Sequence, residues 1–203
     1  MATAFLGCRI SEIAQLDIAS DLCRDDASGV YFVDFNRAPD SDGVLRKGLK
    51  MKASRRLVPL HSALVRHGFV EYLNAQIAAG FTRPFERGWK PYREQERGEV
   101  RWELYIVRWG EREIKKLRES GALGDTGASK LSYFHSMRHA LATTLAMLDV
   151  PEERRAALQG QQHGGENARR YAKLREDVLG HSKMMESSLS GYAALLDAAI
   201  ASP

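Results

Sequence analysis

The chain has 203 residues, of which 44% are hydrophobic and 28% are charged, a composition that fits a folded globular protein and excludes a disordered chain. No apolar stretch approaches the roughly 20 residues needed to cross a bilayer, and no basic and apolar leader follows Met1, which favours a cytoplasmic protein without a membrane partner. The net charge of +4 permits a polyanionic partner without establishing one. Cys8 and Cys23 have no C-x-x-C pair or histidine cluster near them, so we expect free thiols.

The N-terminal half predicts helix, then a small β-meander, then helix again. Apolar residues at helical spacing predict one amphipathic helix over residues 2–16. Alternating aromatic and β-branched residues predict a strand over residues 29–35, and a second strand ends at residues 56–60. A further helix is expected over residues 62–79. Basic residues are expected around the turn of the meander: Lys47, Lys50, Lys52, Arg55 and Arg56.

The C-terminal half predicts mainly helices. Residues 82–99 combine prolines and glycines with many charges, which indicates an exposed loop, and a helix is expected over residues 100–119. After a second loop over residues 121–129, helices predominate. We therefore predict one α+β domain over residues 1–203, mainly α-helical with a small antiparallel β-meander. A C-terminal apolar stripe at helical spacing indicates a buried helix face: Leu189, Tyr192, Leu195, Leu196 and Ile200.

One turn of a predicted helix gathers three basic side chains. His135, Arg138 and His139 lie three and four residues apart, so they share a helix face and can together bind a phosphate. A cation-rich helix start without a function would have the same composition. The neighbouring sequence decides between the two interpretations.

The segment HSMRH, residues 135–139, resembles the H-x-x-R-H box of the tyrosine recombinases, the phage-integrase type of DNA recombinase. Near the start of the chain, GCRISE, residues 7–12, resembles the G-x-R-x-S-E box of the same family, and it maps the first catalytic arginine to Arg9. A structural salt bridge between Arg9 and Glu12 is the alternative role for that arginine. The resemblance implies the catalytic-core fold of this family.

A third segment similar to the family lies between these two boxes. LKMKASRRLVPL, residues 49–60, looks like the β-hairpin that carries the catalytic lysine and ends in R-x-V-P-L. Lys50 fits that lysine best, and Lys52 is the alternate. The three segments occur in the family's order, and the resemblance covers nearly the whole chain.

The resemblance implies an enzyme that cuts and rejoins double-stranded DNA through a 3′-phosphotyrosine, with no metal and no nucleotide cofactor. Arg9 and Arg138 would clamp the non-bridging phosphate oxygens, because guanidinium groups bind such oxygens in pairs. Lys50 would protonate the leaving 5′-oxygen, and His135 would take up or hold the proton of the nucleophile. The expected function is site-specific recombination or integration for a phage or mobile element.

The family's nucleophilic tyrosine has two candidates here. Without gaps, LQGQ at residues 158–161 falls on the L-x-G-[HW] box, and RRYAK at residues 169–173 resembles the R-Y-[GA]-K nucleophile motif. This alignment favours Tyr171. Gln161 then stands where the family has histidine or tryptophan, with His163 two residues later as a candidate replacement.

The other alignment reads LGHS, residues 179–182, as that box. It restores a histidine at His181 and makes Tyr192 the nucleophile, eleven residues later. It also needs an insertion between the boxes, and the apolar stripe around Tyr192 equally indicates a core aromatic residue. Tyr171 is the preferred assignment.

The resemblance begins near Ala4, which implies that the family's N-terminal core-binding domain and the first helix of its catalytic domain are absent. A catalytic core alone is expected to bind DNA weakly, mainly through phosphate contacts, and to form a homo-oligomer on DNA. The shortened start and Gln161 leave an alternative function, a catalytically impaired DNA-binding remnant of a mobile-element integrase.

Overall fold

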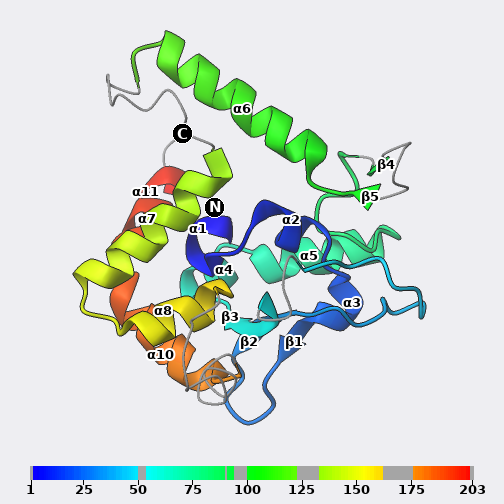
Figure 1. The fold of residues 1–203 in the computed structure, drawn as a ribbon, viewed down its shortest axis with the longest axis horizontal. Helices are drawn as coiled ribbons and strands as arrows, with labels where there is room; N and C mark the ends of the chain where they lie inside the picture. Colours follow the sequence, from blue (N-terminus) through cyan, green and yellow to red (C-terminus); the bar gives the residue numbers. More distant parts are fainter. Residues whose placement is uncertain are drawn as a thin grey trace.

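The computed structural model describes residues 2–49, 54–89, 91–93, 100–122, 133–161 and 176–201. These residues form a mixed α+β fold in which helices surround a small antiparallel sheet, so the predicted class is confirmed (Figure 1). Among them, no helix is both long and apolar enough to span a membrane. Cys8 and Cys23 are both free thiols, as predicted.

The sheet has its strands in the order β1 (Leu22–Arg24), β2 (Tyr31–Phe35) and β3 (Arg56–Pro59). In the central strand, Val33 pairs with Leu22 on one side and with Val58 on the other. Residues opposite each other on paired strands point to the same face of a sheet. Val33 and Val58 are both buried, so this is the face that packs on the hydrophobic core. The predictions of strands at residues 29–35 and 56–60 are confirmed. β1 was not predicted, because three residues are too few for an alternating pattern to be recognised.

The first part of the chain forms three short helices, α1 (Ala2–Leu6), α2 (Ile10–Ala14) and α3 (Ile18–Asp21). The prediction of one helix over residues 2–16 was wrong, because Gly7 adopts a left-handed φ of +57° that ends α1. α1 packs against α7 (Tyr133–Met147) at this point. A Cβ at Gly7 would lie only 2.7 Å from the Cδ2 atom of Leu141, so the glycine allows both the turn and the close packing.

The predicted helix over residues 62–79 is also broken. It forms α4 (Ser62–Arg66) and α5 (Phe69–Ala78), with a left-handed φ of +80° at Gly68 between them. The apolar spacing continues across the break, which is why periodicity alone did not reveal it.

The segment predicted as an exposed loop over residues 82–99 contains part of a second, two-stranded sheet. β4 (Tyr92–Arg93) pairs antiparallel with β5 (Val100–Arg101), so this prediction was incomplete. Arg83, in the same segment, is buried and pairs with Asp40. α6 (Leu104–Glu119) follows, four residues later than predicted, and extends away from the body at the top of Figure 1.

The last described helices are α8 (Glu152–Gln159), α10 (Val178–Ser188) and α11 (Ser190–Ala201). Together with α7 they lie on the left of the sheet in Figure 1, whereas α3 and α5 lie on its right. In α11, Tyr192 and Leu196 pack against the core, but Leu195 and Ile200 are exposed. The predicted apolar stripe was therefore only half correct.

Two of the basic residues predicted around the turn of the meander are buried instead. The Nζ atom of Lys47 lies 2.6 Å from an Asp21 carboxylate oxygen, and both side chains are buried. Arg56 is also buried and bonds three segments of the chain. Buried charges are tolerated only when they are paired and hydrogen-bonded, so both basic side chains are part of the framework of the fold.

Candidate active site

Arg9, His135 and Arg138 line one cavity of about 340 Å³. Arg9 immediately precedes α2, whereas His135 and Arg138 lie on α7, and the packing of α1 on α7 brings these segments together. The sequence boxes that predicted them thus meet in space. The remaining lining residues are Cys8, Ile10, Ser11, Arg101, Glu103, Val107 and Phe134.

Arg138 is the buried member of this set, with 5% of its surface exposed. Its Nη1 donates to the Gly7 carbonyl and its Nη2 donates to the Gln159 carbonyl. Burial, followed by the nearby charges of Arg56 and Arg9, lowers the pKa of Arg138 to about 10, so it is still a cation at neutral pH. Each terminal nitrogen carries a second hydrogen, so both can also donate to an anion in the cavity.

Arg9 is more exposed and bonds its neighbour on the same turn. Its Nη1 donates to the Glu12 Oε1 atom at 2.7 Å, and its backbone N–H donates to the Oε2 atom at 2.8 Å. The alternative role predicted for Arg9, a salt bridge to Glu12, is therefore present. It does not exclude phosphate binding, because the same side chain lines the cavity.

Arg56 does not line the cavity but holds Glu12, the partner of Arg9, in place, and no sequence motif predicted this role. Its Nε donates to the Leu158 carbonyl, its Nη1 to the Ser54 carbonyl and its Nη2 to Glu12, at 2.7, 2.8 and 2.9 Å. Burial alone would raise the pKa of Glu12, but the charge and hydrogen bond of Arg56 outweigh it and hold that pKa below its usual value. Arg56 and Val58 share one face of β3, so strand alternation could have indicated an inward-pointing arginine.

His135 and His139 form a close pair on the exposed side of α7. Their Nε2 atoms lie 2.8 Å apart and the ring planes are nearly perpendicular, at 88°. One ring must donate and the other accept, so the acceptor is neutral. Partial desolvation, followed by the charges of His139, Arg138 and Arg9, lowers the pKa of His135, which favours its neutral form.

Four other candidates, Lys50, Lys52, His163 and Tyr171, lie outside the described residues. The catalytic lysine and the preferred tyrosine therefore stay predictions. Gln161, at the predicted third box, is described, and its Nε2 donates to the Gln159 side chain at 3.0 Å. Gln159 in turn donates to the Arg138 carbonyl at 3.1 Å, so a chain of hydrogen bonds joins this box to Arg138.

The structure does not bring the alternative pair, His181 and Tyr192, to the cavity. The Tyr192 hydroxyl lies 3.5 Å from Thr144 Oγ1, and its ring packs edge-on against Phe5. His181 is fully buried at the start of α10, which packs on β3. Neither residue lines the cavity of Arg9 and Arg138. Their positions are those of core residues.

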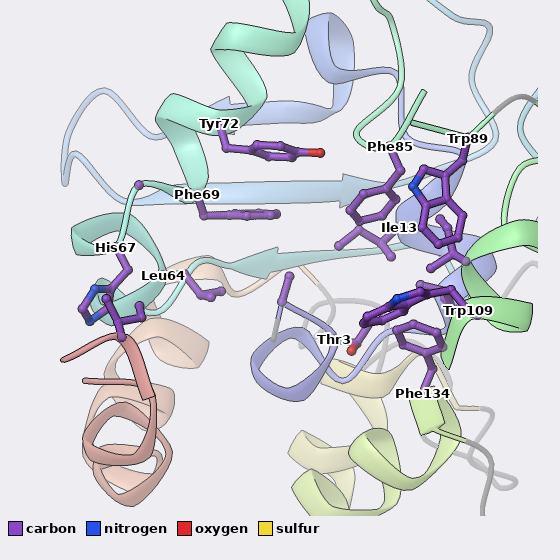
Figure 2. A pocket seen from close by; sticks show the side chains of 15 residues that line it. Thr3, Ile13, Leu64, His67, Phe69, Tyr72, Phe85, Trp89, Trp109 and Phe134 are labelled. Carbon is purple, nitrogen blue, oxygen red and sulfur yellow. The ribbon is translucent and has the colours of Figure 1, made fainter. Parts of the chain in front are cut away.

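A second cavity, of about 490 Å³, is lined mainly by aromatic and aliphatic side chains. Figure 2 shows the rings of Phe69, Tyr72, Phe85, Trp89, Trp109 and Phe134 around it. Three of its polar groups are bonded within the protein: the Tyr72 hydroxyl donates to the Pro84 carbonyl, Thr3 donates to a methionine sulfur and His67 contacts Asp197. This hollow offers apolar surface and little to orient a polar ligand.

Comparison with models of known protein families finds no match, and no curated protein or solved structure matches the chain. Function therefore has to be inferred from the sequence boxes and from the chemistry of the cavity. Among the described residues, no cluster of histidine, cysteine and carboxylate side chains could hold a metal ion.

Proposed function

We propose that this chain is the catalytic core of a tyrosine recombinase and that the cavity of Arg9, His135 and Arg138 receives the scissile phosphate of double-stranded DNA. One observation carries the proposal. Two sequence boxes of the resemblance meet in a single cationic cavity, where Arg138 donates to the Gly7 carbonyl across 131 residues of sequence. Basic residues without a shared function would not need two segments so far apart in the sequence to line the same cavity.

The chemistry explains why these side chains suit the task. A phosphodiester is anionic and gains charge in its pentavalent transition state, which fixed guanidinium groups stabilise. Arg138 is held by two carbonyl groups and is already oriented before DNA binds. The guanidinium group does not have to reorient during the reaction, so its interaction energy can stabilise mainly the transition state.

The proposed reaction has two steps, cleavage of one DNA strand and its rejoining. The Tyr171 oxygen attacks phosphorus and gives its proton to His135, while the bond to the 5′-oxygen breaks and Lys50 protonates that oxygen. The product is a 3′-phosphotyrosine and a free 5′-hydroxyl. A 5′-hydroxyl then attacks the phosphotyrosine in the reverse sense, which rejoins DNA and releases the tyrosine. The energy of the phosphodiester bond is conserved, so no nucleotide cofactor is required.

A second candidate function is a DNA-binding remnant that no longer cleaves. It is favoured by Gln161, whose amide can donate a hydrogen bond but cannot transfer a proton as histidine can. Both candidates share the phosphate cavity and differ only in covalent chemistry.

Duplexes nicked beside the cleaved position separate the two functions, because loss of the short strand traps the covalent intermediate. A library of such nicked duplexes should yield a protein–DNA adduct with the unmodified chain and with Tyr192→Phe. Tyr171→Phe should abolish the adduct. If DNA binds but no member of the library gives an adduct, the remnant is the correct function. If Tyr192→Phe abolishes the adduct instead, the assignment of the nucleophile is wrong.

A further inference from the structure

Arg101 is a third arginine in the wall of the candidate active site, and no sequence box predicted it. It ends β5, and Glu103, two residues later, directly precedes α6. Both side chains line the cavity together with Arg9 and Arg138. The lining contributed by the described residues thus holds three guanidinium groups and one carboxylate, that of Glu103.

Arg101 pairs with a carboxylate, as Arg9 does, but Glu12 is almost fully buried and is also held by Arg56. The Nε and Nη2 atoms of Arg101 both lie 2.9 Å from Glu103 Oε1, and 46% of its side chain is exposed, against 14% for Glu103. Its Nη1 has no acceptor among the described residues, whereas both terminal nitrogens of Arg138 donate to backbone carbonyls. Arg101 is therefore the guanidinium of the cavity whose bonds are easiest to exchange.

The pairing with Glu103 has the chemistry of an anion-binding contact. A carboxylate and a phosphate present oxygens of similar geometry to a guanidinium group, and Arg binds either in a forked arrangement. Because the Arg101 side chain is half-exposed, water screens its attraction to Glu103, and an incoming phosphate can compete with the carboxylate for the guanidinium group. With Glu103 displaced, all three guanidinium groups are available to the DNA backbone.

We propose that Arg101 is a further phosphate ligand of this cavity and that Glu103 occupies it in the free protein as a stand-in for the DNA phosphate. The inference rests on the proposed function and adds a residue to it. Glu103 thereby lowers affinity for DNA in general, since every phosphate has to compete with it, and it limits binding away from a productive site.

Reversible binding tests this proposal without any covalent step. The full chain carrying Tyr171→Phe is titrated with a fluorescent duplex over a series of salt concentrations. Arg101→Ala should weaken binding roughly tenfold at low salt and reduce the salt slope by about 0.9, the value for one lost phosphate contact. Glu103→Gln should strengthen binding roughly threefold or more, because it removes the competing charge.

The pair Arg66 and Asp197 is a matched control, since it is an exposed ion pair that does not line the cavity, with exposed fractions of 54% and 47%. Arg66→Ala and Asp197→Asn should change binding less than the corresponding changes at Arg101 and Glu103. When Glu103→Gln is combined with Arg101→Ala, the gain in affinity from Glu103→Gln should shrink, because the carboxylate then has no guanidinium group of Arg101 to occupy.

The outcomes separate the inference from the proposed function. Loss of binding in Arg138→Ala, without a larger loss in Arg101→Ala than in Arg66→Ala, would keep the phosphate cavity and reject Arg101 as a ligand. If neither Arg138→Ala nor Arg101→Ala weakens binding, both the cavity and the third ligand are rejected. Tighter binding by Glu103→Gln supports the stand-in role even where folding of an arginine variant is in doubt, because a gain of affinity cannot come from misfolding. A Glu103→Gln variant that unfolds at the same temperature as its parent and does not bind more tightly overturns it.

Discussion

The two cavities of this molecule share a wall but differ in chemistry. Ile10 and Phe134 line both, so they form the partition between a cationic hollow and an aromatic one. In the cationic cavity, guanidinium groups are fixed by carbonyl and carboxylate oxygens and keep further N–H groups for a ligand. In the aromatic cavity, the lining is mainly apolar and carries no guanidinium group, and the hydroxyls of Tyr72 and Thr3 already donate to partners inside the protein. The difference teaches that cavity size does not identify a site; unsatisfied donors that are held in place do.

The largest effect on the difference between the two cavities is expected from removing the buried ion pair of Arg56 and Glu12, which holds the residues of the cationic cavity in place. Arg56→Met removes the buried arginine partner of the Glu12 carboxylate and leaves it only the partly exposed Arg9, so it should lower the free energy of unfolding by about 3 kcal/mol. Urea denaturation measures this loss. The double variant with Glu12→Gln should recover part of it, because the uncompensated charge is then gone. A loss of under about 1 kcal/mol would mean that Glu12 finds water or another cation, and that the ion pair does not hold the cavity in place.

Gly7 links the two cavities, because α1 contributes to the aromatic one and the residues after Gly7 to the cationic one. Gly7→Ala should cost about 2–4 kcal/mol, from the left-handed φ and from the contact with Leu141. Gly43→Ala is the matched control, since Gly43 has a φ of +81° but open space around it. Thermal melts should show the larger loss at Gly7. Equal losses would show that packing against α7 is not tight there.

His181 provides a buried basic group to set against Arg138. Its ring nitrogens have no hydrogen-bond partner in the part of the chain that the structure describes, and burial, followed by the charge of Arg154, lowers its pKa to about 4. The unfolded chain binds this proton below pH 6.5 and the folded chain only near pH 4, so stability should fall as the pH drops through this window. At pH 4 the loss from this residue should be about 2–3 kcal/mol.

His181→Leu should remove this part of the pH dependence while leaving the contribution of the carboxylates. Denaturation at a series of pH values measures it in both proteins. Parallel curves for the two would show that His181 is charged in the folded state. The contrast with Arg138, which stays a cation because its pKa of about 10 is still far above neutral pH, would then disappear.

The smallest effect is expected in the aromatic cavity. Tyr72→Phe removes the hydrogen bond to the Pro84 carbonyl and should cost about 1 kcal/mol of stability. DNA binding should be unchanged, because the residue belongs to the cavity that has no guanidinium group in its lining. A clear loss of DNA affinity in this variant, measured beside Arg138→Ala, would erase the functional distinction between the two cavities.

The candidate site was predictable from sequence to the extent that it depends on local motifs. The boxes around Arg9 and Arg138 named two walls of the cavity, since each is a short segment with a recognisable pattern of residues. Arg101 was missed because it belongs to no motif and reaches the cavity only through the packing of β5 and α6. Arg56 was expected to lie around an exposed turn, because its partners at Glu12, Ser54 and Leu158 come mainly from distant parts of the chain.

The fold shows the same limit. Strands β2 and β3 and helix α6 were predicted, because their patterns are strong within a single segment. The breaks at Gly7 and Gly68 were not, since apolar spacing continues through them and the cause is tertiary packing. The burial of Lys47 against Asp21, 26 residues away, likewise depends on a contact that no local pattern records.

The anchoring of Arg138 also has a consequence for how the protein matures. Its two carbonyl partners lie 131 residues before it and 21 residues after it, so one contact of the clamp joins opposite ends of a very long stretch of chain. Closing such a long loop is slow, and synthesis has to pass Gln159 before the second partner exists. A growing chain therefore carries its basic residues without an assembled clamp, and competence to grip a phosphate arises only when the fold is essentially complete.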